Sequence, residues 1–220
     1  MTGLRQSVLA LAFALATCVP VLAGAAGDAV FATGVLDSTD IGTELHYSHR
    51  RSGPDVERFQ PIEVGEVVLR MERGDAAGRE VEITMIADGR KRVLDAFPAS
   101  AGNPVLLAFL ESSLRSMAGI TGGSPFYIRN RLREALQSSG DVLSTDYELE
   151  GRKVAAQELV FHPFSTDPNA ERMGAFSKLE IRFVVSPDVP GYFALFSARA
   201  GEGTDAFSEE IRFVQKEDAK

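Results

Sequence analysis

Residue types that could do chemistry gather in the loop from Phe161 to Pro168. His162, Ser165 and Asp167 are the types that supply a base, a nucleophile and an orienting acid in hydrolases. The chain contains no G-x-S-x-G sequence, which would hold a serine hydroxyl on a sharp elbow between a strand and a helix. Local hydrogen bonding in a turn explains the serine and the aspartate. We therefore expect no catalytic residues here.

His46 and His49 are a second candidate, in the sequence His46-Tyr47-Ser48-His49. They are three residues apart on an expected strand, where they point to opposite faces of the sheet. A shared metal ion would need a bulge or a loop at this point, together with His162 and a carboxylate from elsewhere. We expect two half-exposed histidines, no metal site and no cofactor.

Two further patterns have simpler explanations. Residues 121–124, Thr-Gly-Gly-Ser, lead into a helix N-terminus, where free N–H groups can hold an anion. Because the segment lacks the lysine and the spacing of a phosphate-binding loop, we interpret it as a connection between helices. Glu209, Glu210 and the acidic stretch 37–40 have no convergent partner, since adjacent strand residues point apart, and we expect them to be solvated.

The first 25 residues have the features of a secretory signal. Arg5 precedes an apolar run over 8–16, and residues 23–25, Ala-Gly-Ala, are small enough for a signal peptidase. Residues 26–220 are then a single globular domain that is periplasmic or secreted. An alternative is lipidation at Cys18, the only cysteine. Cleavage after residue 25 leaves a chain without cysteine, and so without disulfides or thiolate chemistry.

Composition excludes one large class of partner. The 220 residues include 23 Lys and Arg against 31 Asp and Glu, a net charge of −8. Because phosphates would repel this chain and no Lys/Arg-rich run offsets the balance, we expect no nucleic-acid partner. No apolar run after the signal is long enough to span a bilayer. We expect a soluble mature domain with no transmembrane segment.

Alternating apolar and polar residues predict antiparallel strands on both sides of a helical middle. Val81, Ile83 and Met85 alternate with polar residues, and Asp88-Gly89 is typical of a tight turn into a returning strand. The expected strands are 43–50, 64–73, 80–87, 92–97, 146–149, 154–161, 179–185 and 192–199, with a last one around Ile211 and Phe213.

The first expected helix begins at Asn103 and Pro104 and can end at Gly119. Its apolar residues recur three and four apart, at Leu107, Leu110, Leu114 and Met117. Residues 105–117 are almost apolar all round, which implies burial on more than one side.

The second expected helix begins at Ser124 and Pro125, stops at Gly140, and has an inward face of Ile128, Leu132 and Leu136. An all-parallel sheet would need a helix between each pair of strands. We therefore predict an α+β fold: a curved, mostly antiparallel sheet, forming an unclosed barrel, with two central helices packed on its concave side.

The order of strands, two helices and strands resembles the periplasmic lipoprotein-carrier superfamily. That likeness covers most of the mature chain in the order of its elements and includes no residue motif. The run from Asn103-Pro104 to Pro125-Phe126-Tyr127-Ile128-Arg129-Asn130-Arg131 is similar to that of uncharacterised exported bacterial proteins. The resemblance implies an unclosed barrel that binds acyl chains under its helices, and it transfers no binding residue by position.

We therefore expect a non-enzymatic binding or carrier protein for a hydrophobic ligand, such as a lipid or an acyl chain. The ligand would lie between the concave face and the first helix, lined by Leu107, Leu110, Leu114 and Met117. A second hypothesis is an interaction or assembly factor of the cell envelope with a protein partner. A third is a hydrolase that uses His162 or the His46 pair.

Overall fold

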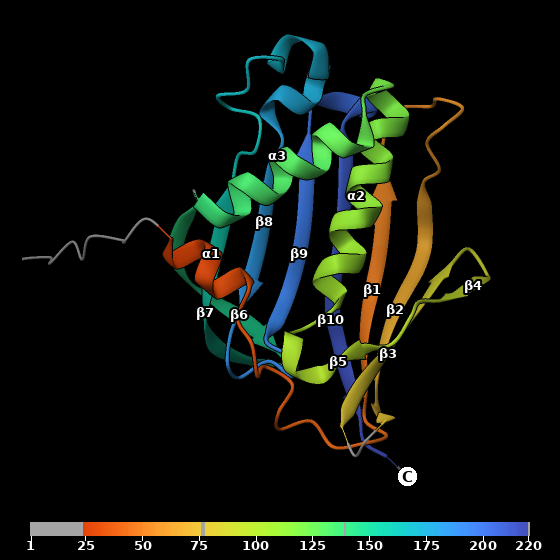
Figure 1. Ribbon diagram of the computed structural model, residues 1–220, viewed down its shortest axis with the longest axis vertical. Helices are drawn as coiled ribbons and strands as arrows, with labels where there is room; N and C mark the ends of the chain where they lie inside the picture. The colour runs from red at the N-terminus through yellow and green to blue at the C-terminus, as the bar shows by residue number, and fades with distance from the viewer. Residues whose placement is uncertain (1–23, 76–77, 139, 220) are drawn as a thin grey trace, which may run out of the picture.

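Figure 1 shows the computed structural model, which describes residues 24–75, 78–138 and 140–219. The described residues form one antiparallel sheet of ten strands, in the order β4-β3-β2-β1-β10-β9-β8-β7-β6, with β5 paired to β3. The strands are β1 (Glu44–Ser52), β2 (Ile62–Arg73), β3 (Arg79–Ala87), β4 (Arg90–Val93), β5 (Phe97–Pro98), β6 (Asp141–Leu149), β7 (Arg152–Phe161), β8 (Glu180–Val185), β9 (Phe193–Ala200) and β10 (Phe207–Glu217). Because β4 and β6 are free edges, the barrel is not closed. The predicted α+β fold is confirmed.

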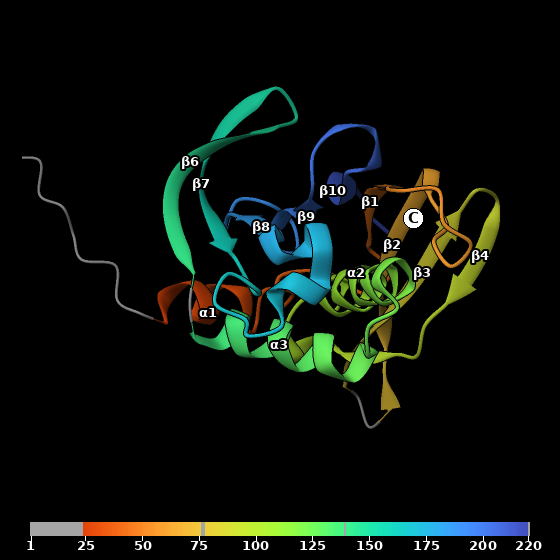
Figure 2. The ribbon, with the colours of Figure 1, turned by 90° about the horizontal axis from the view of Figure 1, so that it is seen from above.

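Three α-helices lie on the concave side of the sheet: α1 (Ala25–Val30), α2 (Val105–Thr121) and α3 (Pro125–Ser138). Seen from above, the sheet curves around them (Figure 2). The 3-10 helices are η2 (Ala99–Ala101), η3 (Ala170–Lys178) and η4 (Gly203–Asp205). Within the described ranges, no helix is long and apolar enough to cross a membrane. The expected signal, with Cys18, lies outside the described residues except for its last two positions.

The ends of α2 follow from its flanking residues. The Asn103 side chain accepts a hydrogen bond from the Val105 N–H at 3.0 Å, as expected of a capping residue. The helix ends at Gly122, whose φ of 68° is the left-handed conformation that glycine adopts without strain. Gly119 was predicted to end the helix, and that prediction is wrong. It lies inside α2, where a Cβ atom would come within 2.5 Å of the Arg58 carbonyl oxygen.

Aromatic side chains fill the space between α2 and the middle of the sheet. The ring centroid of Phe109 on α2 lies 6.0 Å from that of Phe183 and 5.7 Å from that of Phe196. Phe193 and Phe196 stack at 4.6 Å. The predicted inward face of α3 is confirmed, with its three apolar residues all buried: Ile128, Leu132 and Leu136. The aromatic contacts of Phe109 hold α2 over β8 and β9. The other flank of α2 faces β1–β4.

Candidate functional site

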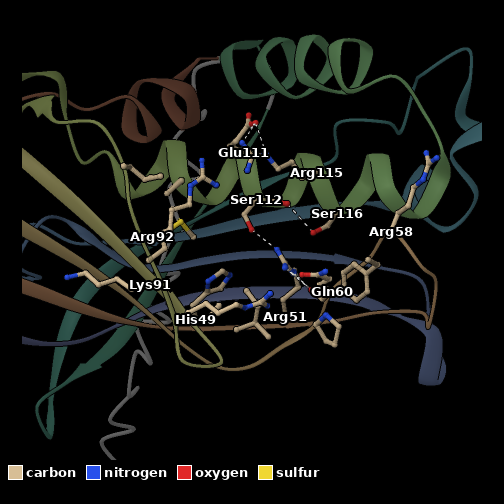
Figure 3. Close-up of a pocket in the computed structure, with 18 residues that line it drawn as sticks. His49, Arg51, Arg58, Gln60, Lys91, Arg92, Glu111, Ser112, Arg115 and Ser116 are labelled. Carbon is tan, nitrogen blue, oxygen red and sulfur yellow. Dashed lines mark hydrogen bonds and ion pairs between the residues drawn. The ribbon is translucent and has the colours of Figure 1, made fainter.

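A cavity of about 490 Å³ lies beside α2, between this helix and the β1–β4 end of the sheet (Figure 3). Its volume is within the range of small-molecule sites. Its lining comes from five segments: His49 and Arg51; Arg58, Phe59, Gln60, Pro61 and Ile62; Met85 and Ala87; Arg90, Lys91, Arg92 and Leu94; and Ala108, Glu111, Ser112, Arg115 and Ser116.

The inner part of the cavity is apolar. Phe59, Ile62 and Ala108 are each less than 9% exposed, and Met85 and Leu94 beside them are half-buried. The basic lining residues of β4 and of the loop before β2 are exposed. The cavity therefore has an apolar floor and a charged mouth.

Small side chains on α2 make room for this cavity. Ala108, Ser112 and Ser116 recur every four residues, so they form one row along the helix. The Ser116 hydroxyl donates back to the Ser112 carbonyl at 3.0 Å, which keeps it close to the helix. This row of short side chains is a signal in the sequence that apolar spacing does not reveal.

A buried polar network lies behind the cavity and is centred on Glu209 of β10, which has no exposed surface. His49 Nε2 is 2.8 Å from Glu209 Oε1, and the Ser112 hydroxyl donates to the same oxygen at 2.5 Å. The Ser113 hydroxyl donates to Glu209 Oε2 at 2.9 Å. Arg51 Nη1 donates to Ser112 Oγ at 2.9 Å. These bonds satisfy the buried carboxylate and tie β1 and β10 to α2.

The same geometry does not activate a serine. A nucleophilic serine needs its hydroxyl bonded to the base, with the acid on the far side of that base. Here His49 and Ser112 both bond to the same oxygen of Glu209, and in the described structure no hydrogen bond joins them to each other. The network therefore positions Arg51 and α2 at the cavity.

Two sequence-based expectations about this network are wrong. Glu209 was expected to be solvated, and His49 half-exposed, yet His49 is 1% exposed. The cause is strand alternation: Glu209 lies on the same face of β10 as the buried Phe207 and Ile211. That register was readable from the sequence and identifies Glu209 as a core residue.

His46 lies on the opposite, convex face, which confirms that the two histidines point apart. Its Nδ1 is 2.6 Å from Glu66 Oε1, and its Nε2 is 3.4 Å from Glu44 and 3.9 Å from Glu217. Ligand atoms of His46, Glu44 and Glu217 lie within 4.8 Å of one another. His46 therefore lies among three carboxylates on the convex face of the sheet.

The loop residues His162, Ser165 and Asp167 are not brought together as a reaction centre. The Ser165 hydroxyl donates to the backbone carbonyl of His162 at 3.0 Å, which is a local turn contact. Asp167 instead accepts a hydrogen bond from the Tyr127 hydroxyl at 2.6 Å and pairs with Arg131 at 2.7 Å. Burial alone would raise the pKa of the Asp167 carboxyl, but these contacts outweigh it and hold that pKa below its ordinary value. This aspartate fastens the loop to α3.

The four residues of the expected ligand lining are divided between core and surface. Leu114 and Met117 belong to the buried core, and Leu110 packs against it. Leu107 is 52% exposed. None of the four lines the cavity beside α2. Their role in binding stays a prediction.

Residues 121–124 connect α2 and α3, as the sequence predicted. The Gly123 N–H donates to the Thr121 hydroxyl at 3.1 Å, and Gly122 closes α2. Residues 121–124 therefore serve as a tight turn between two helices.

A scan against models of protein families finds no match, and a comparison with curated proteins finds none either. Among solved structures, the chain is similar to a β-barrel-like protein of a domain of unknown function, DUF1849, from Brucella abortus. The identity is 9% and the TM-score 0.22, over 80% of this chain and 97% of that chain.

Proposed function

We propose that this protein is a non-enzymatic binding or carrier protein, periplasmic or secreted, which holds the apolar part of a ligand in the cavity beside α2. The observation that carries the proposal is the cavity itself, about 490 Å³ with an apolar floor of Phe59, Ile62 and Ala108. A lipid or an acyl chain is the ligand class that fits such a floor.

The hydrophobic contribution sets an upper limit on the affinity for an acyl chain. Each methylene group that leaves water for an apolar surface contributes about 0.8 kcal/mol. A chain of roughly ten buried methylenes would therefore reach about 8 kcal/mol, which corresponds to micromolar affinity before the loss of ligand freedom is subtracted. The Glu209 network supports this role because it holds the wall of the cavity in place through buried hydrogen bonds.

The test is native mass spectrometry of the protein purified from a periplasm, followed by displacement of a fluorescent fatty-acid probe. We expect a co-purifying lipid and displacement of the probe by added acyl chains. Absence of both would refute the proposal.

A pair of variants locates the binding. Ala87 is half-buried in β3 and lines the cavity, so Ala87→Trp should fill it and weaken probe binding by about tenfold or more. Ala155→Trp places the same side chain at an exposed position of β7, outside this cavity, and should leave binding unchanged. Thermal unfolding of both variants shows whether they fold. A loss of binding in a folded Ala87→Trp protein then reports on the cavity and not on the fold. Equal probe affinity in the two variants would place the ligand elsewhere.

A second candidate function is an envelope interaction or assembly factor. The observation that favours it is the free edge strand β6, where Leu143 is 51% exposed. An unpaired edge can add a strand from a partner protein. The mass spectra described above separate the two candidates, because an assembly factor would carry a protein and no lipid.

A further inference from the structure

Basic side chains surround the mouth of the cavity. Six of its lining residues are cationic, and only one lining residue, Glu111, is acidic. The six are Arg51, Arg58, Arg90, Lys91, Arg92 and Arg115. The whole chain has a net charge of −8. The charge at the cavity mouth therefore has the opposite sign to the net charge of the protein.

Most of these charges are not neutralised by the protein. Arg115 pairs with Glu111 at 3.1 Å, and Arg51 lies 3.7 Å from the buried carboxylate of Glu209. Arg58, Arg90, Lys91 and Arg92 have no carboxylate within ion-pair distance among the residues that the structure describes. Cations held around one opening repel each other, and an anion placed between them relieves that repulsion.

Arg51 lies beside the apolar floor. Its side chain is 15% exposed, and its guanidinium group donates to the Gln60 carbonyl at 2.7 Å and to Ser112 Oγ at 2.9 Å. The guanidinium carbon also lies 5.7 Å from the centre of the Phe59 ring. These contacts fix the side chain before a ligand arrives, at the boundary between the charged mouth and the apolar floor (Figure 3).

We propose that the ligand of this cavity is an anionic amphiphile, with a carboxylate or phosphate head group at the basic mouth and an apolar chain on the floor. The inference rests on the proposed function and adds the chemistry of the head group. Guanidinium groups match the two oxygens of a carboxylate or phosphate, and Arg58 and Arg92 line the cavity from two different segments, at opposite ends of the view in Figure 3.

The test is isothermal titration calorimetry with decanoate, decyl phosphate and decanol, which share a ten-carbon chain and differ in the head group. We expect the two anions to bind about tenfold more tightly than decanol at low salt, since two partly screened ion pairs supply that ratio. Raising the salt from about 0.01 M to about 1 M should close most of the gap. Inorganic phosphate alone should bind more weakly than decyl phosphate. Equal affinity for the two would overturn the proposal that the ligand is an amphiphile.

A matched pair of variants identifies the cations. The double variant Arg58→Gln and Arg92→Gln should bind decanoate and decyl phosphate about tenfold more weakly. Its affinity for decanol should be unchanged. Arg133→Gln with Arg152→Gln changes the net charge equally at exposed positions outside the cavity, and should affect none of the three ligands.

The two proposals fail differently. If decanol binds as tightly as the anions and the Arg58 and Arg92 variant binds all three normally, the head-group inference is wrong while the proposed function stands. If none of the three ligands binds, the proposed function is wrong as well.

Discussion

At the scale of single residues, Glu209 is an acidic side chain that lies within the core. Its neighbour Glu210 is partly exposed and pairs with Arg199 and Arg212 on the surface. One position along the strand separates a solvated carboxylate from one with no exposed surface. The residue types alone predicted the same environment for both, and the apolar register of β10 distinguishes them.

This difference predicts a large contrast in stability. Glu209→Ala leaves the buried hydrogen-bonding groups of His49, Ser112 and Ser113 without their acceptor, so we expect the free energy of unfolding to fall by about 3–5 kcal/mol. Glu210→Ala removes only partly exposed ion pairs and should change it by less than about 1 kcal/mol. Urea unfolding of both variants measures the contrast, and a similar small loss in each would show that the buried network contributes little.

At the scale of elements, apolar spacing was sufficient to predict most strands and both central helices. It placed Ile128, Leu132 and Leu136 correctly because those residues face only the core. It failed for the flank of α2, where Ala108, Ser112 and Ser116 share short side chains and only Ala108 is apolar. It also failed at Gly119, which permits the loop before β2 to approach the helix rather than ending it. Both features depend on a neighbouring segment that is distant in the sequence.

Gly119 tests whether that close approach shapes the cavity. In Gly119→Ala the new methyl group would overlap the Arg58 carbonyl oxygen, so the loop that carries Phe59 must move. We expect the overlap to outweigh the helical preference of alanine, with a net loss of about 1–2 kcal/mol in unfolding free energy and weaker probe binding.

Gly123→Ala is the control, because its methyl group would meet only the side chain of Thr121 within 3.4 Å. It should leave probe affinity within about twofold of the parent protein, a difference of at most about 0.4 kcal/mol. Unchanged affinity in Gly119→Ala as well would mean that the loop does not form the cavity.

At the scale of the whole molecule, the alternating strands and the two helices predicted the unclosed antiparallel sheet. The charges along the sequence did not predict the basic mouth of the cavity. The chain has no long basic run, yet folding brings cations from β1, the loop before β2, β4 and α2 to one opening. Long-range pairing of strands decides which of these segments become neighbours. Composition therefore described the average surface correctly and could not describe the mouth of the cavity.

The most direct measurement of the central claim uses a tryptophan as a local reporter, since the chain has none. Leu94→Trp places it at the cavity, where it replaces a large side chain and so fills less space than Ala87→Trp does. Leu143→Trp places it at an exposed position of β6 as a control. Decanoate carrying bromine atoms in its chain quenches tryptophan fluorescence on contact. We expect quenching of Leu94→Trp that saturates at one ligand per protein and no quenching of Leu143→Trp. No quenching at residue 94, or equal quenching at both positions, would contradict a ligand site between α2 and β1–β4.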